Sequence, residues 1–92
     1  MSALLALLGA AASPQGGRAP VAIWRSSCAY CHQGSKVAPP IPAGIDPAAL
    51  KPLVRNGSGA MPPFHRSEIS DGELDALAEW IRSGGQNDVR PR

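Results

Sequence analysis

The two cysteines of this 92-residue chain, Cys28 and Cys31, lie within one pentapeptide. Cysteines this close together cannot tie distant loops to one another, so a disulfide framework is excluded as the source of stability. A domain of this length buries little apolar surface and commonly needs an additional stabilising element. The chain offers two Trp, one Tyr and one Phe to fill a core. We therefore expect a buried cofactor to complete the core.

The pentapeptide is Cys28-Ala29-Tyr30-Cys31-His32, which has the C-x-x-C-H spacing of covalent haem attachment. Two thiols at this spacing can each form a thioether with one vinyl group of a porphyrin. The adjacent imidazole then lies beneath the iron, where a neutral ring nitrogen is a good ligand. The motif thus predicts one covalent haem c, with His32 as an axial ligand.

Two other uses of the cysteines are weaker interpretations. A zinc site needs about four protein ligands, and His65 is the only further Cys or His beyond the motif. A thioredoxin-like redox pair would need a βαβ context, and the sequence shows no strand-like alternation. Haem attachment is therefore the interpretation that we retain.

Met61 is the predicted second axial ligand. Most methionines fill cores, but Met61 is the only internal one and follows a Gly-rich turn, away from any apolar helical face. His65, four residues later, competes for the same position, and an open position is the remaining alternative.

The segment before the motif is typical of a helix, with Pro20 at its first position. Its apolar residues follow at spacings of three and four: Val21, Trp24 and Cys28. Trp24 is expected to anchor the core. Residues 33–44 show neither the helical period nor the alternation of a strand, and they contain three prolines. We therefore expect a loop there.

A second helix is predicted to begin at Asp46, as N-cap, with Pro47 in its first turn. Its predicted apolar face consists of Leu50, Leu53 and Val54. Pro52 is expected to interrupt this helix or make it begin twice, and Asn56-Gly57 to end it.

The best helical signal lies near the C-terminus. Ser70 and Glu73 form a capping box, and Gly84-Gly85 ends the run. Four apolar residues form an i, i+3, i+4, i+7 stripe: Leu74, Leu77, Ala78 and Ile81. The sequence predicts an all-α domain of three to four short helices, with long loops wrapped around one haem.

The N-terminal residues 1–12 are almost wholly apolar and too short to span a bilayer as a helix. Their length and the Ala10-Ala11-Ala12 run are typical of a signal peptide, although an uncleaved apolar leader fits too. We expect export to the periplasm or another extracytoplasmic side. Residues 13–19 are then a flexible joint, 20–85 the monohaem domain and 86–92 a disordered tail.

The formal net charge is +2, and the basic residues are scattered along the chain. The sequence therefore lacks the cluster of basic residues that is typical of nucleic-acid binding. We expect a monomer, without a membrane span in the mature domain, whose partners are other redox proteins.

From about Pro20 to Ser83 the chain resembles class I cytochromes c. The resemblance is carried by the C-x-x-C-H motif, by Met61-Pro62-Pro63-Phe64 after Gly57, and by the helix ending in Trp80-Ile81. It implies the cytochrome c fold and a crossing of the first and last helices at Trp24 and Trp80. The expected haem-pocket residues are Trp24, Pro39, Pro40, Ile41, Pro62 and Phe64.

Two features depart from the family pattern. Gln33 follows the histidine where the family usually has Gly, and the stretch to the next prolines is short. Either Pro39 or Pro40 could therefore supply the carbonyl that receives the His32 ring N–H. Pro52 lies inside what is normally an unbroken middle helix, so that helix is expected to be shortened.

With both axial positions filled by the protein, the iron suits outer-sphere electron transfer, and a thioether ligand favours the ferrous state. The predicted function is a one-electron carrier, or a relay subunit of a respiratory or dehydrogenase chain, with no catalytic residues of its own. The alternative is a ligand-binding or peroxidase-like haem protein with a weak or open sixth position.

Overall fold

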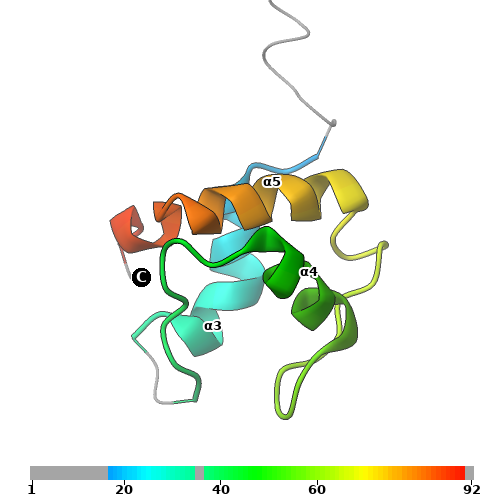
Figure 1. Cartoon of the computed structure of the whole chain (residues 1–92), viewed down its shortest axis with the longest axis horizontal. Coiled ribbons are helices and arrows are strands. Elements are labelled where there is room, and N and C mark those ends of the chain that lie inside the picture. The colour runs from blue at the N-terminus through cyan, green and yellow to red at the C-terminus, as the bar shows by residue number, and fades with distance from the viewer. Residues whose placement is uncertain (1–16, 35–36, 91–92) are drawn as a thin grey trace, which may run out of the picture.

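The computed structural model describes residues 17–34 and 37–90. In these ranges the regular elements are helices: α2 (Pro20–Ile23), η2 (Trp24–Cys28), α3 (Ala29–His32), α4 (Pro47–Asn56), α5 (Asp71–Arg82) and η3 (Gly85–Asp88). Figure 1 shows α5 lying across the helical run that ends in α3, with α4 beside them. The all-α prediction is confirmed. The predicted leader, 1–12, and most of the joint, 13–19, lie outside the described residues.

The first three elements follow one another without a break, from Pro20 to His32. Pro20 occupies the first turn, as expected. Trp24–Cys28 form a π-helical turn, and the N–H of Ala29 bonds to the carbonyl of Trp24. Such turns occur mostly as single insertions and frequently at functional sites. The 3.6-residue period did not predict this one, which leads directly into the cysteine motif.

Helix α4 begins where the sequence indicates, since the Asp46 carboxylate accepts from the N–H of Ala48 at 2.9 Å. The predicted interruption at Pro52 is wrong, because α4 runs unbroken over 10 residues. Pro52 and Ala48 are both exposed, so water can satisfy the carbonyl that lacks its helical N–H partner.

The apolar face of α4 is narrower than predicted. Leu50 and Val54 are buried, whereas Leu53 is 43% exposed. Leu53 lies three residues after Leu50 but on the solvent side, because α4 turns only one edge toward α5 and the core.

Helix α5 has the predicted capping box. The Glu73 N–H donates to Ser70 Oγ at 3.1 Å, and the Ser70 N–H donates to Glu73 Oε1 at 2.8 Å. The whole predicted stripe is buried: Leu74, Leu77, Ala78 and Ile81. The helix ends at Arg82, and Gly84 takes the left-handed conformation at φ 88°. No helix in the described ranges is long and apolar enough to cross a membrane.

The helical run 20–32 crosses α5 at the two tryptophans, as the family resemblance implied. The rings of Trp24 and Trp80 lie 5.9 Å apart between centroids, with their planes tilted by 56°. A tilted pair of this kind adds about 0.5–1.5 kcal/mol beyond the area it buries. Trp24 is 1% exposed, so its expected role as a core anchor is confirmed.

Residues 86–90 depart from the expected disordered tail. Gly85–Asp88 form one turn of 3-10 helix, and Gln86 is buried. The Gln86 side-chain Nε2 donates to the Ile41 carbonyl at 3.0 Å. The C-terminal segment therefore supports the loop that follows the cysteine motif.

Candidate functional site

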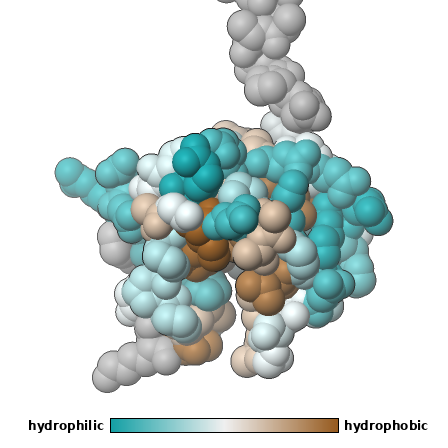
Figure 2. Space-filling model, viewed as in Figure 1, coloured by the Kyte–Doolittle hydropathy of each residue, from teal (hydrophilic) through white to brown (hydrophobic). Residues whose placement is uncertain are grey.

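A cavity of about 500 Å³ opens between the helical run 20–32 and helices α4 and α5. Figure 2 shows a hollow on this side of the molecule, bordered by hydrophobic residues. Volumes of about 300–1,000 Å³ with mostly apolar walls are typical of cofactor sites. Its inner wall is formed by core side chains: Leu50, Val54, Ile69, Leu77 and Ile81.

The cavity brings together most of the residues that the sequence singled out. Eight of them line it: Cys28, Cys31, His32, Pro39, Ile41, Met61, Pro62 and Phe64. Trp24 lies in the core outside the lining, and Pro40 is exposed. His65, the competitor of Met61, is exposed and does not line the cavity.

His32 is oriented by the loop that follows it. Its Nδ1 lies 2.8 Å from the carbonyl oxygen of Pro39. A carbonyl only accepts hydrogen bonds, so Nδ1 donates, and in the neutral imidazole Nε2 then keeps a free lone pair. Of the two candidate prolines, Pro39 is the one that makes this contact. An imidazole held in this way is a typical metal ligand.

The two thiols of the motif lie on the cavity wall. Both cysteines are free and partly buried. Burial raises the pKa of the Cys28 thiol to about 11, so this group is protonated at neutral pH. Among the described residues, no three His, Cys, Asp or Glu side chains cluster as metal ligands.

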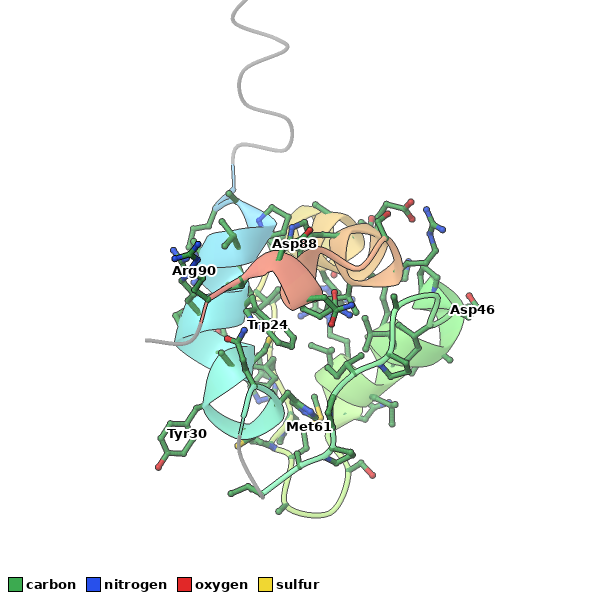
Figure 3. The ribbon with its side chains drawn as sticks, turned by 90° about the vertical axis from the view of Figure 1, so that its left-hand side faces the viewer. Trp24, Tyr30, Asp46, Met61, Asp88 and Arg90 are labelled. Carbon is green, nitrogen blue, oxygen red and sulfur yellow. The ribbon has the colours of Figure 1, made fainter. Side chains whose placement is uncertain are left out.

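Met61 is placed by a tight turn. Met61 and Ser58 exchange main-chain hydrogen bonds of 2.9 and 3.0 Å. Gly57, at φ 74°, passes so close that a Cβ there would lie 2.6 Å from the Met61 carbonyl oxygen. In Figure 3 Met61 lies in the interior of the molecule, whereas Tyr30, within the cysteine motif, points outward.

The sequence analysis missed the role of Gln33. Its Oε1 accepts from Trp24 Nε1 at 3.3 Å, and its Nε2 donates to the Val89 carbonyl at 2.6 Å. Gln33 therefore joins the core tryptophan to the C-terminal segment. Its position after the motif marked it only as a departure from the family pattern.

Other lining residues were missed too, and four of them had a signal. Helical periodicity had assigned these four to core faces: Leu50, Val54, Leu77 and Ile81. The remaining missed residues have no signal of their own: Ser27, Tyr30, Val37, Ala38, Ser58, Ala60 and Ile69.

The residues present fit a haem c. Two thiols, an imidazole with a free Nε2 and a thioether line one apolar cavity. Such a set would hold a haem c through its two thiols and through one nitrogen and one sulfur ligand.

Comparison with known proteins gives an independent indication. Residues 15–81 match the model of the family described as cytochrome c oxidase, cbb3-type, subunit III. Over 58 residues the chain is 36% identical to the 4-cresol dehydrogenase (hydroxylating) cytochrome c subunit of Pseudomonas putida. That match covers 61% of this chain and 51% of the relative, so the chain spans about half the relative's length.

Two crystal structures of p-cresol methylhydroxylase, one with substrate bound and one at 2.5 Å resolution, share the fold. Each has a TM-score of 0.65 and 33% sequence identity, and the matches cover 71% of this chain and 90% and 92% of theirs. Since the family match covers well over half of the chain, the chain belongs to this family of c-type cytochromes, as an electron-transfer protein that carries haem c.

Proposed function

We propose that the chain holds a single haem c, attached through Cys28 and Cys31, with His32 and Met61 as axial ligands, and transfers one electron at a time. The observation that carries the proposal is the shared cavity. It brings the C-x-x-C-H side chains and the Met61 thioether to one apolar space, although they are far apart in the sequence.

The residues of the chain have distinct roles in this proposal. The Pro39 carbonyl keeps the proton on Nδ1 of His32, so that Nε2 is the ligating atom. The turn between Ser58 and Met61 holds the thioether in the cavity. Haem c, when bound, supplies a reversible one-electron iron couple.

Two protein ligands leave no axial position for substrate or oxygen, which favours outer-sphere transfer. The apolar lining excludes water, and low polarity together with a thioether ligand favours the reduced state. A peroxidase-like function finds no support here, because His32 is the only histidine among the described residues that line the cavity.

The partner and the compartment are part of the same proposal. The Pseudomonas putida relative is named as the cytochrome c subunit of a dehydrogenase. We propose a similar relay, in which this chain accepts electrons from a dehydrogenase-type redox partner after export to the periplasm. Fractionation of cells that express the full chain tests the location: a haem-stained band confined to the cytoplasm would contradict it.

The central test is expression with a c-type haem maturation system, followed by a haem-stained denaturing gel and visible spectra. We expect stain that survives denaturation, and a sulfur-to-iron charge-transfer band in the ferric protein. Haem that washes off in denaturant would refute covalent attachment.

Met61→Ala and His65→Ala form a matched pair for the ligand assignment. Met61→Ala should lose the band, lower the reduction potential and bind carbon monoxide when reduced. His65→Ala should behave as the unchanged protein, because His65 lies outside the cavity. The reverse result would identify His65 as the ligand.

A further inference from the structure

Arg55 lies in the last turn of α4 and does not line the cavity. Its guanidinium donates to the Phe64 carbonyl at 3.2 Å, to the Ile69 carbonyl at 2.7 Å and to Asp71 Oδ1 at 2.7 Å. The Arg55 side chain is only 20% exposed. One partly buried cation therefore fixes three points of the segment that leads from the Met61 loop to α5.

Phe64 is held at both of its main-chain groups by the end of α4. Its N–H donates to the Val54 carbonyl at 2.8 Å, and its carbonyl accepts from Arg55. Phe64 and Ile69 both line the cavity, and Ile69 is 1% exposed. The Arg55 contacts therefore anchor backbone whose side chains form the cavity wall.

The strap of residues 58–64 is fixed at its two ends. The Ser58–Met61 hydrogen bonds fix one end, and the Phe64 contacts fix the other. Between Met61 and Phe64 lie two prolines, which have restricted φ and no N–H to bond with other groups. The direction of the Met61 side chain thus depends on both anchors, the Ser58–Met61 turn and the contacts of Phe64.

We infer that Arg55 is a positioning residue, which holds the strap so that Met61 stays in the cavity as the axial ligand. This inference rests on the proposed function, in which Met61 binds the iron. Without Arg55, the Phe64 and Ile69 carbonyls lose a charged donor. A single buried hydrogen bond to a charged group corresponds to roughly a tenfold or larger change in a local equilibrium.

The test is an imidazole titration of the ferric holoprotein. Binding is measured as the loss of the sulfur-to-iron charge-transfer band. Imidazole must displace Met61, so its apparent affinity rises with the fraction of molecules in which the strap is released. We expect Arg55→Ala to raise the apparent imidazole affinity by about tenfold or more. Amide hydrogen exchange of Phe64 should accelerate in the same variant.

Lys51→Ala is the matched control. Lys51 lies one turn earlier on α4 and pairs with Asp75 of α5 at 3.0 Å, and its ammonium forms no hydrogen bond or ion pair with the described residues of the strap. Lys51→Ala removes one positive charge, as Arg55→Ala does, and an ion pair between α4 and α5. We nevertheless expect the imidazole affinity of Lys51→Ala to stay within about twofold of the unchanged protein.

Two further variants separate the carbonyl contacts from the ion pair. Arg55→Lys keeps a cationic donor and should lie between the unchanged protein and Arg55→Ala, which also covers the case in which Arg55→Ala does not fold. Asp71→Asn removes the charge of the ion-pair partner, which is 65% exposed, and should have little effect on imidazole.

The outcomes distinguish the two proposals. If the unchanged protein shows the band but Arg55→Ala and Arg55→Lys both match Lys51→Ala in imidazole affinity, the inference is overturned while Met61 ligation stands. A lower unfolding midpoint without a change in imidazole affinity would assign Arg55 a merely structural role and overturn the inference too. An unchanged protein without the band overturns Met61 ligation and, with it, the role of Arg55.

Discussion

The two sides of the cavity are built in different ways. On one side, His32 ends a continuous helical run and directly follows the two cysteines. On the other side, Met61 lies in a loop that is held by main-chain hydrogen bonds and by one arginine. The His32 side draws its order mainly from the helical run, whereas the Met61 side draws it mainly from hydrogen bonds within the loop and to the end of α4. We therefore expect substitutions on the His32 side to change global stability and those on the Met61 side to change ligation first.

The largest effect is expected for Trp24→Ala. Trp24 is fully buried between the first helical run and α5, so its truncation should cost about 3–5 kcal/mol in the free energy of unfolding. Phe64→Ala, on the Met61 side, removes a half-buried ring and should cost about 1–2 kcal/mol. Urea unfolding of both holoproteins measures the difference, and equal losses would break the comparison.

Two glycines with similar backbone angles test the Met61 side more sharply. Gly57 and Gly34 have φ of 74° and 70°, but only at Gly57 would a Cβ meet other atoms. Gly34→Ala should cost about 1–2 kcal/mol for the left-handed conformation alone. Gly57→Ala adds an overpacking cost of about 1–3 kcal/mol.

Because the added methyl group at Gly57 meets the Met61 carbonyl and the backbone of Pro63, we also expect weaker Met61 ligation in Gly57→Ala. Gly59→Ala is the control within the same loop. Gly59 also has a positive φ, but a Cβ added there would meet no other atom within 4 Å. A sulfur-to-iron band equally strong in all three variants would show that the close approach at Gly57 does not matter for the ligand.

Gln33→Ala should have an intermediate effect, on the His32 side. It leaves the Trp24 indole N–H and the Val89 carbonyl without this partner, at a cost of about 1–3 kcal/mol. Gln33→Glu keeps the acceptor for Trp24 and removes the donor to Val89, so it should mainly speed hydrogen exchange in residues 85–90. Equal exchange in both variants and in the unchanged protein would show that the bridge contributes nothing.

Local signals in the sequence predicted much of the fold. The Asp46 cap and the Ser70–Glu73 capping box act within one helical turn, so the sequence alone contains both partners. The buried stripe of α5 follows from its period. The errors concern tertiary surroundings: Pro52 is tolerated and Leu53 is exposed because of where α4 lies against its neighbours, which no local pattern reveals.

The candidate site divides in the same way. The cysteine motif is contiguous, and Met61 stood out because it is the only internal methionine. Gln33 bonds to a carbonyl 56 residues away, and Arg55 bonds to carbonyls 9 and 14 residues away in an irregular loop. Side chains that bond to distant main-chain carbonyls leave no residue-type pattern at the receiving end, so these supports could be found only in the folded chain.

The smallest predicted effect concerns the place where the two sides meet. Arg18, just before α2, donates from its N–H and Nε to Glu73 and from its guanidinium to the Glu68 carbonyl. The two Arg18 bonds to the Glu73 carboxylate and the bond from the Ser70 N–H lower the pKa of Glu73 from 4.5 to about 2. A carboxyl with a lowered folded-state pKa stabilises the fold above its unfolded pKa, and this contribution disappears as the pH falls. The protein should therefore lose some stability between about pH 4.5 and 2, and Glu73→Gln should remove this part of the pH dependence of the unfolding midpoint.

Glu79→Gln is the control, since Glu79 pairs with Arg82 within α5 and does not join the two sides. If the two variants change hydrogen exchange of residues 65–69 equally at pH 3, the link through Arg18 does not couple the first helix to the Met61 side.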